Sequence, residues 1–375
     1  MSQAKGEVRK IRVGVLFGGR SGEHEVSLTS AKGIIEAMDK EKYEIVPIGI
    51  TKAGQWLAGG DVHRRLIDAA AGQPVIGDHL KQAEPSPERS LTLPIAETGP
   101  LDVVFPVLHG PLGEDGSVQG FLELAGLPYV GAGVMASAVG MDKAICKQVF
   151  QAQGLPIVPY LSFLRRRWHA QADDVITECE ANLNYPMFVK PANLGSSVGI
   201  HKAKRRVELR AGLQDAARYD RKLIVEQGLE AREIEISVLG NDEPIASLPG
   251  EIIPSREFYS YAAKYIDDAS KLLIPAPLTA EKTELVQHLA IAAFKALDCS
   301  GLARCDFLLD RATDELYLNE LNTMPGFTPI SMYPKLWAAS GLSYRELIDR
   351  LVELAFERYE ESQRSETSFD IDTAE

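Results

Sequence analysis

The chain has 375 residues, of which 45% are hydrophobic and 25% are charged, a composition typical of soluble globular proteins. Its formal net charge of −13 excludes a general nucleic-acid-binding surface, because such a surface needs clustered lysine and arginine. The four cysteines show no C-x-x-C spacing, which argues against a zinc site and favours a reducing cytoplasm. No stretch is apolar enough to span a bilayer, so we expect no membrane partner.

The first third of the chain predicts an α/β layer built on a parallel sheet. Residues 11–17 form an apolar run that ends in two glycines, and a polar loop and a helical pattern over 27–38 follow. Residues 43–50 and 103–108 are further candidate buried strands. The stretch 72–99, rich in proline, glycine and charge, is interpreted as an irregular insertion, and it overlaps the wider insertion expected at 56–98.

The rest of the chain predicts two further units of α+β type. The second begins near Met141 and the third near Arg232, so we expect domains at 1–135, 136–231 and 232–361, followed by a polar, acidic tail at 362–375. The expected strands are 187–190, 223–226, 233–239, 302–309 and 315–321, and the expected helices are 142–153, 280–296 and 343–361.

The segment ARCDFLLDRATDELYLNELNTMPG, residues 303–326, carries the strongest chemical signal. If its two strands form a symmetric hairpin, Asp306 lies opposite Glu320 and Arg304 opposite Asn322, all on one face. Two facing carboxylates are destabilising unless a positive charge lies between them. Because Mg²⁺ prefers such oxygen ligands, the pattern predicts a magnesium site at Asp306, Glu320 and Asn322. The alternative is a solvated hairpin whose charges never meet.

Two glycine-rich loops are further candidate sites. A strand delivers Lys190 ahead of the loop 195–199, whose small residues let backbone N–H groups approach phosphate oxygens. The loop lacks the Walker A order, so an ordinary flexible turn is the alternative. The loop after the first strand leads to Glu25, which could hold a substrate ammonium or merely favour the helix dipole.

Several motifs occur in an order that resembles the D-alanine–D-alanine ligases of the ATP-grasp superfamily. They are GGRSGEHEVSL, LHGPLGEDGSVQG, GAGVMASAVGMDK, VKPANLGSSVG, YSYAAKY, and ARCDF followed by NELNTMPGFTPISMYP. The similarity runs from about residue 11 to about residue 359. It implies a three-domain ATP-grasp fold, in which an N-terminal parallel-sheet domain precedes two α+β domains that sandwich ATP.

The resemblance also implies a reaction. Two D-alanines would be joined through an acyl phosphate, with ATP converted to ADP and phosphate, for peptidoglycan synthesis. Two Mg²⁺ ions, replaceable by Mn²⁺, would be held by the predicted hairpin site, with Glu320 bridging them. A cytoplasmic homodimer and activation by K⁺ are implied as well.

Individual site residues follow from the matching motif positions. For ATP they are Lys143 and Lys190 at the α- and β-phosphates, Glu226 and Leu229 at the adenine, Glu233 at the ribose, Lys264 at the transferred phosphate, and Ser196, Ser197, Asn319 and Glu320. For the two amino acids they are Glu25 at the first ammonium, His109 near the same subsite, Arg304 and the Gly326 N–H at the oxyanion, and Ser331 at the second carboxylate. Tyr265 and Ser196 would bond to Glu25 and hold a loop at 259–268 over the site.

Three alternatives stay open. A relative that joins D-alanine to D-lactate generally lacks the tyrosine that matches Tyr265. Another ATP-grasp ligase would act on a different carboxylate and amine, and it would not need the ordered positions at Glu25, Tyr265 and Ser331. A catalytically inactive nucleotide-binding regulator would have no use for the oxyanion donor Arg304.

Overall fold

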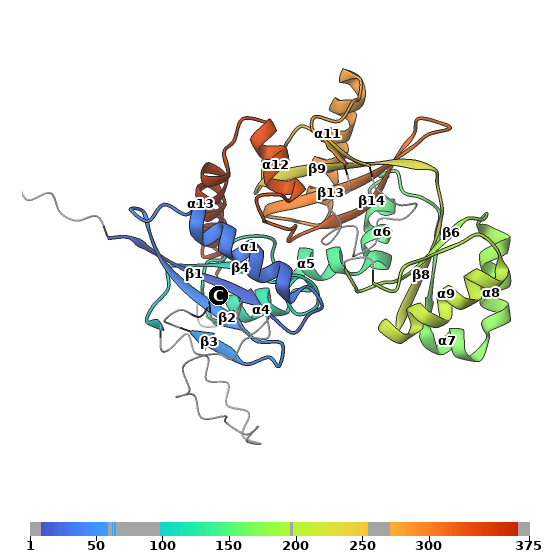
Figure 1. Cartoon of the computed structure of the whole chain (residues 1–375), viewed down its shortest axis with the longest axis horizontal. Coiled ribbons are helices and arrows are strands. Elements are labelled where there is room, and N and C mark those ends of the chain that lie inside the picture. The colour runs from blue at the N-terminus through green and yellow to red at the C-terminus, as the bar shows by residue number, and fades with distance from the viewer. Residues whose placement is uncertain are drawn as a thin grey trace, which may run out of the picture.

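A computed structural model of the chain describes residues 9–58, 62, 64, 98–195, 198–253 and 271–366. The predicted site residues Ser196, Ser197, Lys264 and Tyr265 lie outside the described residues, as do the loop at 259–268, most of the insertion and the end of the tail. The described residues form three lobes, each built on its own sheet (Figure 1).

The N-terminal lobe holds a sheet of strand order β3-β2-β1-β4, in which β1, β2 and β4 are parallel and β3 is antiparallel. Its elements are β1 (Ile11–Gly18), α1 (His24–Ala37), β2 (Tyr43–Ile50), β3 (Trp56–Ala58), β4 (Val103–Val107), α4 (Ser117–Leu124) and α5 (Val134–Met141). Alternate residues of β1 face opposite sides, with Val15 packed toward α1 and Leu16 toward α4. The predicted parallel sheet is confirmed.

The central lobe is an antiparallel sheet of order β5-β8-β6-β7. Its elements are α6 (Lys143–Ala152), β5 (Tyr160–Leu164), α7 (Arg165–Ala170), α8 (Ala172–Asn182), β6 (Met187–Pro191), β7 (His201–Ala203), α9 (Arg206–Tyr219) and β8 (Lys222–Gln227). Helices α7, α8 and α9 share one apolar core with this sheet and cover the side away from the other lobes (Figure 1). The opposite side of the sheet is therefore available to a ligand.

The C-terminal lobe holds an antiparallel sheet of order β12-β11-β9-β13-β14, with β10 paired to β9. Its elements are β9 (Ala231–Gly240), β10 (Ile245–Ala246), β11 (Gly250–Ile253), β12 (Lys271–Leu273), α11 (Ala280–Ala296), β13 (Gly301–Asp310), β14 (Leu316–Asn322), α12 (Met332–Ala339) and α13 (Tyr344–Ser362). On β13, Cys305 and Phe307 pack into the core beneath α11, so Arg304 and Asp306 face the other side. The sheet thus presents one polar face.

The hairpin of β13 and β14 has the predicted register. Arg304 pairs with Asn322 and Asp306 with Glu320, but the register then shifts by one residue before Phe307. The extra residue of this β-bulge is Asn319, which the sequence pattern did not predict. A bulge changes the direction of neighbouring side chains, so neither Asn319 nor Glu320 is packed in the apolar core on the other side of the sheet.

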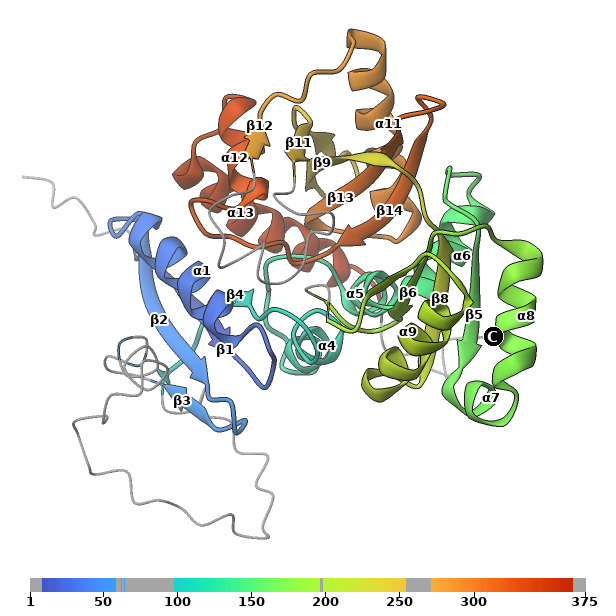
Figure 2. The same cartoon turned by 45° about the vertical axis from the view of Figure 1, so that its right-hand side comes forward.

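Two helices pack across the predicted domain boundaries. Leu347 and Leu351 of α13 lie in the core of the N-terminal lobe, and Cys146 and Phe150 of α6 lie in the core of the C-terminal lobe. In Figure 2, α4 and α5 lie between the N-terminal sheet and the central lobe. The boundaries near 135 and 231 stay a prediction. Within the described ranges, no helix combines the length and the apolar character needed to cross a membrane.

Candidate active site

A row of three carboxylates crosses the polar face of the C-terminal sheet. Asp306 on β13 lies opposite Glu320 on β14 and opposite Glu235 on β9. Arg304 Nε and Nη2 donate to the two oxygens of Asp306, both at 2.7 Å, and Nε lies 3.1 Å from Glu235 Oε2. Although burial acts to lower it, the pKa of Arg304 is held well above its ordinary value by Asp306 and Glu235. A partly buried, permanently charged guanidinium therefore lies beside this row.

The residues of the predicted magnesium site fit a hard divalent cation. Asp306, Glu320 and Asn322 offer oxygen ligands on one face of the hairpin, which is the donor chemistry that Mg²⁺ prefers. Asn322 Oδ1 also accepts a hydrogen bond of 2.9 Å from the Met324 N–H, which fixes its side chain. The alternative of a solvated hairpin is not supported, because Asp306 contacts Arg304 and Glu320 lies 3.5 Å from Lys143.

Two buried lysines surround Glu226 between the central and C-terminal sheets. Lys190 Nζ lies 2.6 Å from Glu226 Oε2, and Lys147 Nζ lies 3.2 Å from Glu226 Oε1. Both lysines also reach Asn319: Lys190 donates to its side-chain oxygen at 3.4 Å and Lys147 to its backbone carbonyl at 3.1 Å. The sequence interpretation missed Lys147, although its position four residues after Lys143 on the same helix face was visible.

Lys143 connects the glycine-rich loop to the carboxylate row. Its ammonium lies 3.5 Å from Glu320 Oε2 and donates to the Leu194 carbonyl at 3.0 Å. Burial acts to lower the pKa of Lys190. The carboxylates of Glu226 and Glu320, together with Glu233 on β9, nevertheless hold this pKa above its ordinary value. Leu229, in the connection between β8 and β9, is half-buried. Contacts thus join Lys190 to Glu226 and Asn319, and Lys143 to Glu320, whereas the role of Leu229 stays a prediction.

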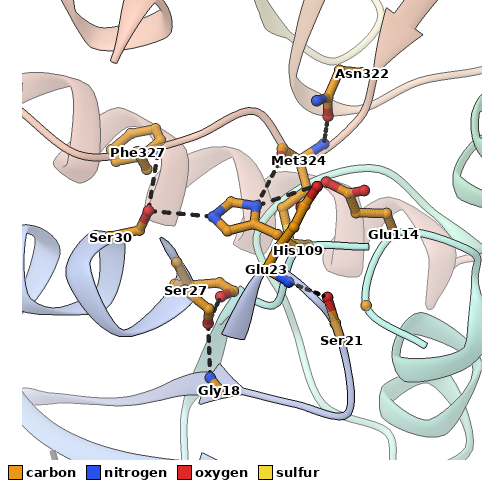
Figure 3. Close-up of polar contacts among 12 residues, drawn as sticks. Gly18, Ser21, Glu23, Ser27, Ser30, His109, Glu114, Asn322, Met324 and Phe327 are labelled. Carbon is orange, nitrogen blue, oxygen red and sulfur yellow. Dashed lines mark hydrogen bonds and ion pairs between the residues drawn. The ribbon is translucent and has the colours of Figure 1, made fainter. Parts of the chain in front are cut away.

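A second group of polar side chains lies at the carboxyl ends of β1 and β4, where open α/β sheets bind ligands (Figure 3). Glu23, His109 and Glu114 are all buried, and their ligand atoms lie within 4.8 Å of one another. His109 Nδ1 lies 3.1 Å from the Met324 carbonyl and 3.7 Å from Glu114 Oε1. Although burial acts to lower it, the pKa of His109 is raised by Glu114 and Glu23. The group therefore favours a positively charged ligand.

Local hydrogen bonds hold this group in place. The Ser27 hydroxyl accepts from the Gly18 N–H at 2.7 Å and donates to the Val107 carbonyl, so it joins the ends of β1 and β4 (Figure 3). Ser30 Oγ lies 3.2 Å from His109 Nε2 and accepts from the Phe327 N–H at 3.4 Å. Helix α1 is thus tied both to His109 and to the C-terminal lobe.

The structure places Glu25 away from the group formed by Glu23, His109 and Glu114. Helix α1 begins at His24, so Glu25 lies in its first turn with an exposed side chain that pairs with Lys52. Positions 23 and 25 point to opposite sides because successive helical residues turn by about 100°. Glu23 is the carboxylate that faces His109 and Glu114, and the sequence interpretation missed it. The sequence offered a signal for Glu23, because the motif GGRSGEHEVSL contains both glutamates. Glu114 could have been found in the same way, because it lies in the motif LHGPLGEDGSVQG.

The loop after β14 brings Gly326 and Ser331 together. A Cβ added to Gly326 would lie 3.1 Å from Ser331 Oγ, and Ser331 precedes α12 as its N-cap residue. Phe327 anchors the loop, because its buried ring packs against Phe105 at 5.9 Å and Tyr344 at 5.5 Å between centroids. The His109–Met324 contact attaches the other end of the loop to the N-terminal lobe.

Comparison with known proteins agrees with this arrangement. The family model "D-ala D-ala ligase N-terminus" matches residues 12–132, and "D-ala D-ala ligase C-terminus" matches residues 149–353. A D-alanine–D-alanine ligase of Heliobacterium modesticaldum is 54% identical over 365 residues, covering 96% of this chain and 98% of the relative. A protein of the same name from Natranaerobius thermophilus is 49% identical over 365 residues, covering 96% and 99%.

Solved structures of ligases are also similar to this chain over nearly its whole length. The D-alanine-D-alanine ligase from Coxiella burnetii superimposes with a TM-score of 0.78 at 36% identity, covering 95% of this chain and 97% of that one. The VanG D-Ala:D-Ser ligase from Enterococcus faecalis has a TM-score of 0.77 at 34% identity, covering 92% and 100%. The three-domain ATP-grasp fold expected from the motifs is confirmed, and the chain belongs to the D-ala D-ala ligase family.

Proposed function

We propose that the protein joins two D-alanine molecules into D-alanyl-D-alanine, with conversion of ATP to ADP and phosphate, for peptidoglycan synthesis. One observation carries the proposal: the two polar groups meet at the glycine-rich loop. A Cβ added to Gly195 would lie 3.1 Å from Glu23 Oε1, while the preceding Leu194 accepts a hydrogen bond from Lys143, which contacts Glu320. A group that favours an ammonium therefore lies beside a site suited to phosphates and a divalent cation.

In the first step, Glu23 binds the ammonium of the first D-alanine, with His109 and Glu114 behind it. A carboxylate oxygen of this D-alanine attacks the γ-phosphorus of ATP, the bond from that phosphorus to the β-phosphate bridging oxygen breaks, and ADP leaves. The resulting acyl phosphate is an electrophile that a free carboxylate is not. The proposed nucleotide contacts are Lys143, Lys190, Ser196, Ser197, Glu226, Leu229, Glu233, Lys264, Asn319 and Glu320.

In the second step, the amino nitrogen of the second D-alanine attacks the carbonyl carbon. Arg304 and the Gly326 N–H donate to the oxygen that gains negative charge, and fixed donors of this kind contribute several kcal/mol. The carbon–oxygen bond to phosphate then breaks, phosphate leaves with the electron pair, and the nitrogen releases its proton. Ser331 receives the second carboxylate, because the N-terminus of α12 favours an anion.

Asp306, Glu320 and Asn322 would hold two Mg²⁺ ions, which Mn²⁺ could replace. When bound, such ions offset the negative charge of the phosphates during transfer. Tyr265 and Ser196 are proposed to bond to Glu23 rather than Glu25 and to keep the loop at 259–268 closed over the acyl phosphate, away from water. Activation by K⁺ is proposed from the resemblance alone.

The proposed setting is the cytoplasm, where ATP is abundant and the buried cysteines Cys146, Cys179, Cys299 and Cys305 stay reduced. We propose a homodimer, which light scattering of the purified protein would contradict if it gave the 41.0 kDa mass of one chain. No nucleic-acid or membrane partner is proposed.

The experiment that tests the activity measures phosphate release with ATP and Mg²⁺. D-alanine alone should support release, and L-alanine should not. D-lactate and D-serine, each added together with D-alanine, test the choice of second substrate, since one structural relative bears the name of a D-Ala:D-Ser ligase. Equal release with L-alanine would contradict the proposal.

A further inference from the structure

Glu226 is the one carboxylate between Lys147 and Lys190, and all three side chains are almost completely buried. Lys147 is 1% exposed and Glu226 is 2% exposed. Glu226 is therefore shared by two ammonium groups, and Glu320 and Glu233 also act on Lys190. Because the carboxylate is shared, one ammonium group can turn toward an anion such as a nucleotide phosphate while the other stays paired with Glu226.

The two lysines cannot serve the same purpose once a nucleotide is bound. Lys190 makes the short contact with Glu226, at 2.6 Å, yet it is also the proposed phosphate ligand. An ammonium that turns toward a phosphate weakens its contact with Glu226. The carboxylate would then be buried and uncompensated unless Lys147, at 3.2 Å, stays in place.

Lys147 has the contacts of a fixed residue. It belongs to α6, it pairs with Glu226 on β8, and it donates at 3.1 Å to the backbone carbonyl of Asn319 on β14. It thereby joins one helix to both of the sheets that would enclose the nucleotide. Although burial acts to raise it, the pKa of Glu226 is lowered by the two lysines, with Lys147 contributing the larger Coulomb effect.

We propose that Lys147 is the permanent counter-ion of Glu226, which frees Lys190 to bind a nucleotide phosphate, and that Lys147 is thus a positioning residue for ATP. The inference rests on the proposed ATP site but not on the identity of the two amino acids. Lys147 does not contact the phosphate itself. Its effect is exerted through Glu226 and through the main chain at Asn319.

The test measures the dissociation constant of ADP, with Mg²⁺, by calorimetry of the full-length protein. Lys147→Met keeps the length of the side chain and removes its charge, so Lys190 stays bound to Glu226 and the constant should rise about tenfold or more. Lys282→Met is the matched control, because Lys282 is a part-buried lysine that pairs with Asp314 at the hairpin turn. The control should change the constant by less than about twofold.

A double variant separates charge compensation from packing. In Lys147→Met/Glu226→Gln there is no carboxylate to compensate, so ADP should bind more tightly than to Lys147→Met alone. An unchanged dissociation constant in Lys147→Met overturns the inference. So does a double variant that binds ADP about tenfold or more weakly than Glu226→Gln alone, because the single variant already includes any contribution of Glu226 to nucleotide binding.

If Lys147→Met does not fold, the comparison is made in the Glu226→Gln background. There, removal of Lys147 should weaken ADP binding by no more than about twofold, and a loss of about tenfold overturns the inference. The proposed ligase activity is tested separately by dipeptide formation in the unsubstituted protein. Tight ADP binding without dipeptide would contradict the ligase proposal and leave the inference about Lys147 intact.

Discussion

Asp306 lies directly opposite Glu320 on the neighbouring strand of the hairpin. Facing carboxylates repel each other, and here a third carboxylate, Glu235, continues the row. Arg304 compensates part of this charge through two hydrogen bonds to Asp306. The remaining negative charge would favour a divalent cation at the proposed site.

Replacement of Glu320 with glutamine should remove much of the metal affinity. The variant keeps the size of the side chain but loses a carboxylate of the proposed metal site, so Mn²⁺ binding measured by electron paramagnetic resonance should weaken and turnover should fall about 100-fold or more. Glu315→Gln, just before the other end of β14, changes the same residue type at a position where the side chain accepts a hydrogen bond from the Tyr317 hydroxyl. Equal metal affinity in the two variants would place the ions elsewhere.

Replacement of Arg304 with lysine should lower kcat far more than it affects nucleotide binding. Lysine keeps the positive charge but cannot make the two parallel hydrogen bonds to Asp306, so the oxyanion donor loses its position. A fall in kcat of about 100-fold, with the ADP dissociation constant nearly unchanged, is expected. A variant with near-normal turnover would show that Arg304 serves only to neutralise the carboxylates.

Glu23→Gln and Glu25→Gln distinguish the two candidate ammonium ligands. The buried Glu23 faces His109 and Glu114, whereas the exposed Glu25 pairs with Lys52. The KM for D-alanine should therefore rise about tenfold or more in Glu23→Gln and change by less than about twofold in Glu25→Gln. The reverse result in steady-state kinetics would restore the original assignment of Glu25.

The raised pKa of His109 predicts a pH-dependent contribution to stability. Because the folded state binds the proton more tightly than the unfolded state, this contribution is fully present below the ordinary pKa of 6.5 and is lost as the pH rises through the folded value. Urea unfolding should show a larger difference between the unsubstituted protein and His109→Gln at about pH 5.5 than at about pH 9. Glu114→Gln should reduce this pH dependence. A difference that does not vary with pH would mean that the pKa of His109 is the same in the folded and unfolded states.

Phe327 should be the main apolar anchor of the loop that carries Gly326 and Ser331. Its side chain is 2% exposed, so Phe327→Ala should lower the free energy of unfolding by about 3–5 kcal/mol. Ile330, in the same loop, is 71% exposed, and Ile330→Ala should change stability by less than about 0.5 kcal/mol. Chemical denaturation of both variants measures the contrast, which would vanish if the loop were anchored elsewhere.

The strands of the fold were predictable because apolar runs and alternating patterns have a direct physical cause. The strand 43–50 and the helix 280–296 were assigned the bounds that the structure shows, and the pairing of Asp306 with Glu320 followed from the two-residue period of a strand. The bulge at Asn319 was not predictable, since no glycine or other signal in the strand marks it.

The site was predicted less evenly than the fold. Glu23 was missed because the helical pattern was expected from residue 27, whereas α1 begins at His24, and a helix start carries little apolar signal. Lys147 was missed because a lysine on a helix is ordinarily exposed, and only the tertiary structure shows that Glu226 and Asn319 enclose it. Contacts between lobes of this kind leave no periodic trace in the sequence.

The most direct test of the central claim follows the oxygen atoms of the substrate. D-alanine labelled with ¹⁸O in its carboxylate is incubated with the protein, ATP and Mg²⁺, and the products are identified by mass. If an acyl phosphate forms, the released phosphate carries one ¹⁸O atom from D-alanine and the other product is D-alanyl-D-alanine. Unlabelled phosphate, or the absence of the dipeptide, would contradict ligation through an acyl phosphate at this site.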